Sequence, residues 1–132
     1  MDIRQAHVLS LRDTDIAGAL YRLSGDEAMY SECLRAFLCD PTVEQLNISL
    51  ECCAWDEAFT AAHALKGVAG NLGFIPLMHS TGQLIVLIRG GRMMDIPMAL
   101  EQVNSAYRDI LDGIYQYFAI ADESTKEMHH EN

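Results

Sequence analysis

The sequence has little positive charge, and this shortage excludes several classes of partner. Only two of its 132 residues are lysine, Lys66 and Lys126, and the formal net charge at neutral pH is −10. A surface this acidic repels the phosphate backbone of nucleic acids and the anionic headgroups of lipids. We therefore expect neither nucleic acid nor a membrane among the partners.

Long apolar runs are also missing from the sequence. No stretch approaches the about 18 consecutive apolar residues that a membrane-spanning helix requires. The first five residues, Met1 to Gln5, lack the charged and then apolar layout of a secretory signal. These two absences predict a cytoplasmic protein.

A recognisable cysteine motif is missing as well. The four cysteines, Cys33, Cys39, Cys52 and Cys53, match neither a CxxC redox pair nor a zinc knuckle. Cys33 and Cys39 fall in a helical apolar pattern, where free cysteine behaves as a small hydrophobe, so we expect core thiols in a reducing compartment. We expect no bound metal and no cofactor on this chain.

Proline is rare as well, with three residues, whereas half of the sequence is hydrophobic, a composition typical of a packed globule. Apolar residues recur every three or four positions along most of the chain, and no alternating strand pattern is present. We therefore expect an all-α fold, namely an antiparallel four-helix bundle with additional short N-terminal helices.

Glycine, proline and capping residues divide the chain into six predicted helices. These cover residues 14–23, Asp26 to Phe37, Thr42 to Cys53, Trp55 to Leu72 with Gly73 as its cap, Pro76 to about residue 89, and Ile96 to Tyr117. We place the bundle in residues 1–121, with its core at about 15–118, and expect a flexible polar tail over 122–132.

The segment from residue 58 to 72 has an unusual outer face. At about 100° of rotation per residue, six apolar side chains fall within about 60° of Leu65 and form the core stripe. They are Ala58, Ala61, Ala62, Val68, Ala69 and Leu72. His63 falls about 160° from Leu65, on the side that faces water.

Four further residues share this outer side with His63: Phe59, Lys66, Gly67 and Gly70. A glycine inside a helix costs about 1 kcal/mol relative to alanine, and close helix packing does not explain two glycines that face solvent. An uncovered backbone beside an exposed aromatic ring and an imidazole indicates a binding surface for another protein.

These residues also suit phosphoryl transfer. An imidazole is largely neutral and nucleophilic near neutral pH, and it attacks a phosphoryl group in line where the approach is open. Gly67 and Gly70 would leave the approach open, and the ammonium group of Lys66 could stabilise the phosphoryl oxygens. From spacing alone, an interaction surface and a chemical site both remain open.

The run His63-Ala64-Leu65-Lys66-Gly67, followed by Leu72-Gly73, resembles the signature of histidine phosphotransfer (HPt) domains. It is similar as well to the phosphotransfer domain of chemotaxis histidine kinases, in which a glycine follows at the place of Gly70. More loosely, the similarity extends from about residue 15 to residue 118. The run from Leu23 to Asp26 looks like the family's first interhelical turn, and Phe37 like its second-helix aromatic residue.

The resemblance implies a four-helix bundle with His63 as the phosphorylated residue on its second helix. It implies that the phosphoryl group passes to or from the aspartate of a response-regulator receiver domain, free or within a hybrid sensor histidine kinase, and that magnesium belongs to that partner. Lys66 then faces the phosphate and Gly67 gives access. No kinase activity of its own is implied, and the sequence has no P-loop and no kinase glycine-rich loop.

One position departs from the family pattern. Many relatives place Glu or Gln on the next helix, 22 positions after the histidine, to bond the imidazole, and here that position is Ile85. Gln83 lies about 200° away around that helix, and His79 falls off its apolar stripe, at the surface. Which group fixes the imidazole therefore stays open.

Two main functions are compatible with the sequence. The first is a phosphoryl carrier that acts through His63 and Lys66, with Phe59, Gly67 and Gly70 admitting the partner. The alternative is a helical docking module that binds a receiver or a histidine kinase without being phosphorylated. The intact His63, Lys66 and Gly67 favour the carrier, because docking needs no nucleophile, whereas Ile85 favours the docking module. In a third possibility, a kinase domain on another chain phosphorylates His63 directly.

Overall fold

Helices make up almost all of the regular structure in the computed structural model, which describes residues 1–130 and, in the last helix, side chains as far as Glu123. The helices are α1 (Ile3–Ser10), α2 (Ile16–Arg22), α3 (Glu27–Leu38), α4 (Thr42–Glu51), α5 (Trp55–Leu72), α6 (Ile75–Arg89), a short 3₁₀ turn (Met93–Asp95) and α7 (Ile96–His130). The described residues contain no β-strand, only an isolated bridge between Thr14 and Phe74. The predicted all-α class is confirmed.

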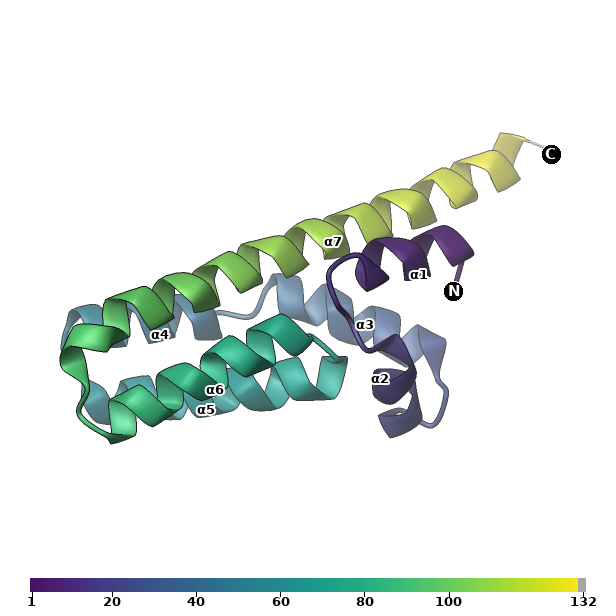
Figure 1. Cartoon of the computed structure of the whole chain (residues 1–132). Coiled ribbons are helices and arrows are strands. Elements are labelled where there is room, and N and C mark those ends of the chain that lie inside the picture. The colour runs from purple at the N-terminus through teal and green to yellow at the C-terminus, as the bar shows by residue number, and fades with distance from the viewer. Residues whose placement is uncertain (131–132) are drawn as a thin grey trace.

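Four of these helices, α4 to α7, form an antiparallel bundle (Figure 1). Helix α5 packs against α4 and α6, and α7 contacts both α6 and α4, which closes the ring. The connections are short, covering residues 52–54, 73–74 and 90–95, so successive helices lie antiparallel. The predicted bundle is therefore present, with His63 on its second helix.

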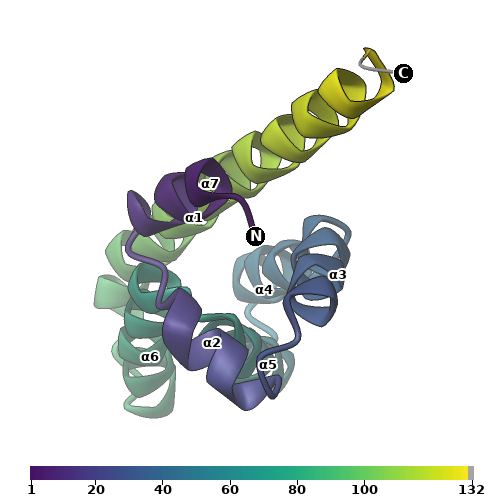
Figure 2. The same cartoon turned by 90° about the vertical axis from the view of Figure 1, so that its right-hand side faces the viewer.

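The first three helices lie at the end of the bundle where α5 turns into α6 (Figures 1 and 2). Helix α2 contacts α5, and α3 contacts both α5 and α7. Helix α1 lies beside the C-terminal half of α7, where the side-chain amide of Gln5 donates to the Tyr117 carbonyl at 3.2 Å.

The helix boundaries predicted from the sequence begin at residue 14 and therefore miss α1. This helix starts at a capping box, in which the Asp2 carboxylate accepts from the backbone and the Gln5 side chain accepts in return. Its eight residues bury only Gln5 and Leu9, too few to produce a visible apolar period.

The buried face of α5 is built largely from alanine. Ala58, Ala62 and Ala69 are fully buried together with Leu65 and Leu72, whereas Ala61 and Val68 are half-buried at the edge of the stripe. Small side chains allow close approach of neighbouring helices. The predicted core stripe is confirmed, and it fixes which side of α5 faces water.

A sharp turn at Gly73 joins α5 to α6. Gly73 has φ +80°, and its carbonyl accepts from the backbone N–H of Asp15 at 2.8 Å. The next residue, Phe74, is buried and packs edge-on against Phe37 with ring centroids 5.0 Å apart. The turn therefore ties the α5–α6 hairpin to the start of α2 and to the core under α3.

The prediction of core thiols is wrong for three of the four cysteines. Cys39, Cys52 and Cys53 are exposed, and Cys33 is half-buried. Cys39 and Cys52 occupy the positions that end α3 and α4, and Cys53 follows with φ +54°. These three cysteines lie at or beyond the ends of their helices, where an apolar period no longer indicates burial.

Helix α7 extends beyond the end predicted for it at Tyr117. Helix α7 continues through the segment predicted as a polar tail as far as His130, while residues 131 and 132 lie outside the described residues. Flexibility of this segment stays a prediction. No helix in the described part of the chain combines the length and hydrophobicity that crossing a bilayer requires.

Replacement of Gly73 by alanine should destabilise the fold more than the same change at Gly25. Both residues have positive φ, but a Cβ at Gly25 meets open space, whereas a Cβ at Gly73 would collide with the Asp15 backbone. We expect Gly25→Ala to cost about 1 kcal/mol and Gly73→Ala about 2–4 kcal/mol. Urea unfolding followed by circular dichroism measures both costs, and equal values would contradict this account of the turn.

Stability should fall in alkali because of Tyr30. This side chain is fully buried, its hydroxyl donates to the Leu72 carbonyl at 3.0 Å, and burial raises the pKa of the phenol well above its usual range. The unfolded chain releases this proton at about pH 10, so the free energy of unfolding is retained below that pH and falls as the pH rises above it. Unfolding at pH 8 and pH 10.5 should show this loss, and Tyr30→Phe should reduce it.

Candidate functional site

His63 lies near the middle of α5, on the side turned away from the core. Its side chain is exposed, and so is that of its neighbour Ala64. The buried stripe on the opposite side holds α5 in this orientation, so the position of the imidazole follows from the packing of the helix. The prediction that His63 faces water is confirmed.

The ring of Phe59 stacks on the imidazole of His63. The two rings are nearly parallel, with an angle of 10° between their planes and 5.9 Å between their centroids. Residues four apart lie on the same helix face, which brings the rings together. Phe59 is half-buried and packs against the core, so it is less exposed than the sequence led us to expect.

Arg89 completes this group from the neighbouring helix. Its guanidinium carbon lies 5.2 Å from the centroid of the Phe59 ring, within the range of a cation–π contact. Arg89 is the last residue of α6, and the antiparallel hairpin returns it to the level of Phe59 near the start of α5. Arg89 cannot be placed beside His63 from a helical wheel, because a wheel describes one helix at a time.

Lys66 lies on the α6 side of the same surface. It lines a shallow hollow with Met78, His79, Gly82, Gln83 and Val86. Its alkyl chain passes over Gly82, where an added Cβ would lie 3.7 Å from Cε and 3.8 Å from Nζ. Within the described residues the ammonium group forms no ion pair and no hydrogen bond, so it remains available to an anion.

The two glycines of this face differ in their surroundings. A Cβ at Gly67 would meet nothing within 4 Å, so this backbone is open to solvent. Gly70 is half-buried, and a Cβ there would lie 3.3 Å from the sulfur of Met78 on α6. Close packing therefore does account for Gly70, which the helical wheel did not predict.

The register of α5 against α6 identifies the residue opposite His63. Three pairs define this register: Gly70 with Met78, Lys66 with Gly82, and Phe59 with Arg89. Each pair is centred on Phe74 in the sequence. The same register pairs His63 with Ile85, which is buried and carries no polar group.

The imidazole of His63 has no hydrogen bond to any residue that the structure describes. Gln83 and His79 are both exposed, as the sequence predicts for His79. The absence of a polar residue at position 85 is therefore not compensated by another polar side chain within the described part of the chain.

Acidic residues are absent from this part of the sequence. From Ala58 to Met94 there is no Asp or Glu, although the chain has 19 of them, and the same stretch contains Lys66, Arg89 and Arg92. Arg92 is paired with Asp95 at 2.8 Å. From residue 58 onward the hairpin that carries His63 therefore has only basic charged side chains, whereas Asp56 and Glu57 lie in the first turn of α5. This acid-free stretch is a signal in the sequence that leads to Arg89.

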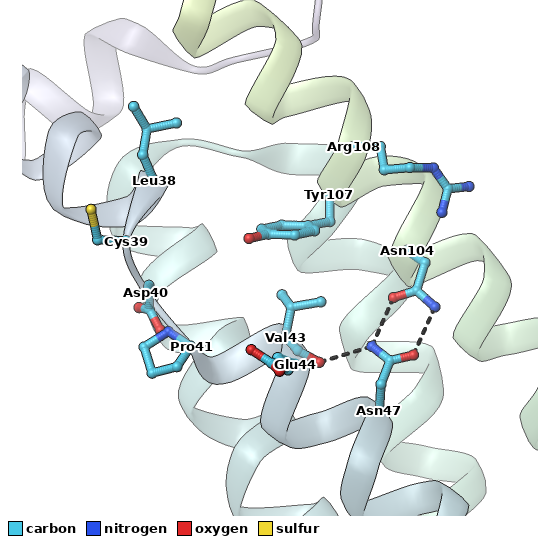
Figure 3. A pocket seen from close by; sticks show the side chains of 10 residues that line it. All are labelled: Leu38, Cys39, Asp40, Pro41, Val43, Glu44, Asn47, Asn104, Tyr107 and Arg108. Carbon is cyan, nitrogen blue, oxygen red and sulfur yellow. Dashed lines mark hydrogen bonds between the residues drawn. The ribbon is translucent and has the colours of Figure 1, made fainter.

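A second hollow, of about 480 Å³, lies away from His63 between the α3–α4 connection and α7 (Figure 3). On one side Asn47 and Asn104 exchange two amide hydrogen bonds, of 3.0 and 2.9 Å. Burial is the main cause that raises the pKa of the Tyr107 phenol, and the negative charge of the Asp40 carboxylate raises it further. These contacts join α4 to α7, and neither His63 nor Lys66 lines this hollow.

Comparison with known proteins identifies the family of the chain. No curated protein and no solved structure matches the chain significantly. The family described as "Hpt domain" matches residues 38–115, which is more than half of the chain and runs from the end of α3 into α7, with His63 inside it. This match covers the bundle and the helix on which the exposed imidazole lies. The chain belongs to the Hpt domain family, the histidine phosphotransfer modules of two-component signalling.

Proposed function

We propose that this chain carries a phosphoryl group on His63 and exchanges it with the aspartate of a response-regulator receiver domain, free or within a hybrid sensor kinase. The observation that carries the proposal is an exposed imidazole in the middle of α5, next to the open backbone of Gly67 and the unpaired ammonium group of Lys66. We further propose that the exchange takes place in the cytoplasm.

The transfer step requires only an open, neutral imidazole and a partner with an aspartyl phosphate. A lone pair of one ring nitrogen forms the N–P bond while the P–O bond to the partner's carboxylate breaks, and that carboxylate leaves with the electron pair. The other ring nitrogen keeps its proton, so the ring becomes cationic. The reverse step returns the phosphoryl group to a receiver aspartate.

The charge around His63 suits this exchange. Lys66 is one turn away on α5 and can reach oxygens of the phosphoryl group as it transfers. Arg89 adds a second positive charge, and no acidic side chain belongs to the stretch from residue 58 to 94. The site therefore complements the phosphate and the acidic, magnesium-binding pocket that the partner brings.

A non-phosphorylated docking module is the second candidate. It is favoured by the pairing of His63 with Ile85, which leaves the imidazole without the polar partner that many relatives have. A docking module would use the same surface but would not need the free lone pair of an imidazole. Phosphorylation of His63 by a kinase domain on another chain would give the same product as the carrier from a different donor.

Mixing the purified chain with a phosphorylated receiver domain and Mg²⁺ tests the proposal. We expect a phosphoryl adduct in the intact mass of the chain that is lost in acid and absent from His63→Gln. Binding of the receiver, measured by calorimetry, should survive in His63→Gln. Binding without an adduct, across the receiver domains of the same genome, would exclude the carrier and leave the docking module.

Gly67→Ala should stabilise the protein and slow the transfer. Alanine in an exposed helix is favoured over glycine by about 0.5–1 kcal/mol, and a Cβ at Gly67 meets no atom of this chain within 4 Å. The methyl group would instead obstruct the partner, and we expect the transfer rate to fall by about tenfold or more.

Urea unfolding and single-turnover transfer measure the two effects of Gly67→Ala. Ser105→Ala is the control, because Ser105 is exposed on α7, which does not contact α5 within the described residues, and the change should alter helix stability alone. Unchanged transfer in Gly67→Ala would show that access over this glycine is not needed.

A further inference from the structure

The imidazole of His63 stacks on one aromatic ring and, within the described residues, forms no hydrogen bond. Within the described residues the only specific contact of the ring is the stack on Phe59, with planes 10° apart. Ile85, the residue opposite on α6, offers only aliphatic carbon. An exposed side chain without any such contact would populate several rotamers, so the stack is the contact that restricts the ring.

Phe59 is itself restrained from two directions. Its ring is half-buried and packs against the core, and the guanidinium of Arg89 lies 5.2 Å from its centroid. The restraint therefore extends from the core and the end of α6, through Phe59, to His63. The orientation of the imidazole therefore depends on its stacking contact with Phe59.

We propose that Phe59 is the positioning residue of His63: its ring holds the plane of the imidazole and leaves both ring nitrogens unbonded. This inference rests on the proposed function, since positioning matters only if His63 reacts. A hydrogen bond would hold the ring by one nitrogen, whereas a stack holds it by its face. The nitrogens then remain free for the phosphoryl group and for solvent.

Positioning and docking have different kinetic consequences. A residue that orients the nucleophile changes the limiting rate of transfer at saturating partner, because fewer bound complexes have the ring in line. A residue that only contacts the partner changes the concentration of receiver needed for half-saturation. If Phe59 only admits the partner, as its place beside His63 in the sequence predicts, then its replacement should change the half-saturating concentration and not the limiting rate.

The experiment compares Phe59→Leu, Phe59→Tyr and Phe118→Leu. Leucine keeps apolar bulk and removes the ring, whereas tyrosine restores the ring. Phe118 is the matched control, because it is also half-buried and lies under an arginine, with the Arg35 guanidinium carbon 4.3 Å from its centroid, but it is on α7. Single-turnover transfer from a phosphorylated receiver is measured over a range of receiver concentrations.

We expect Phe59→Leu to lower the limiting rate by about two- to tenfold, the range that corresponds to one aromatic stack, with the half-saturating concentration unchanged. Phe59→Tyr should restore the rate, and Phe118→Leu should leave it unaltered. A higher half-saturating concentration with an unchanged limiting rate in Phe59→Leu would overturn the proposal and make Phe59 a docking contact.

NMR of the unphosphorylated protein tests the stack without any transfer. The ring protons of His63 should lose a ring-current shift in Phe59→Leu, keep it in Phe59→Tyr and keep it in Phe118→Leu. Unchanged His63 resonances in Phe59→Leu would overturn the stack. If the wild-type chain accepts no phosphoryl group, the proposed function fails, and the resonances still decide whether Phe59 holds the ring.

Discussion

The antiparallel pairing of α5 with α6 at the Gly73 turn determines which side chains surround His63. A two-residue connection leaves little freedom of register, and the hydrogen bond from Asp15 to the Gly73 carbonyl fixes the turn against α2. Because the register is set there, Gly82 comes to lie beneath Lys66, and Arg89 comes to lie over Phe59. The surroundings of the imidazole therefore depend on a turn ten residues away along the helix.

The two faces of α5 have different roles: one packs in the core, and the other is exposed around His63. Alanine and leucine on the buried side fill the narrow space between α4 and α6, and they leave no polar group to be satisfied there. On the exposed side, Gly67 sacrifices some helix propensity and leaves the backbone uncovered. This loss of helix stability at an exposed position is consistent with a partner that has to approach the backbone closely.

Much of this arrangement could be predicted from the sequence, because it depends on the order of residues within single helices. The bounds of α5, its cap at Gly73 and the outward position of His63 follow from apolar spacing and from one glycine. Relations between helices could not be predicted in this way. Arg89 and Met78 belong to the surface of α5 only through the register of α6, and no single-helix period contains that information. The wrong prediction of buried cysteines has a related cause, since the spacing of apolar residues does not show where a helix ends.

The location of His63 along α5 has a consequence for how a phosphoryl group would be held. The partial positive charge at the start of a helix stabilises anions, and the negative charge at its end repels them, but both effects fade within about one turn. His63 lies about two turns from either end of α5, and the carbonyls of Gly70 and Asn71 near the far end are already bonded by the Arg22 guanidinium at 2.7 and 3.1 Å. The macrodipole thus neither captures nor expels a phosphate at this residue. Its retention would depend on side chains alone, which suits a group that has to be both accepted and given up.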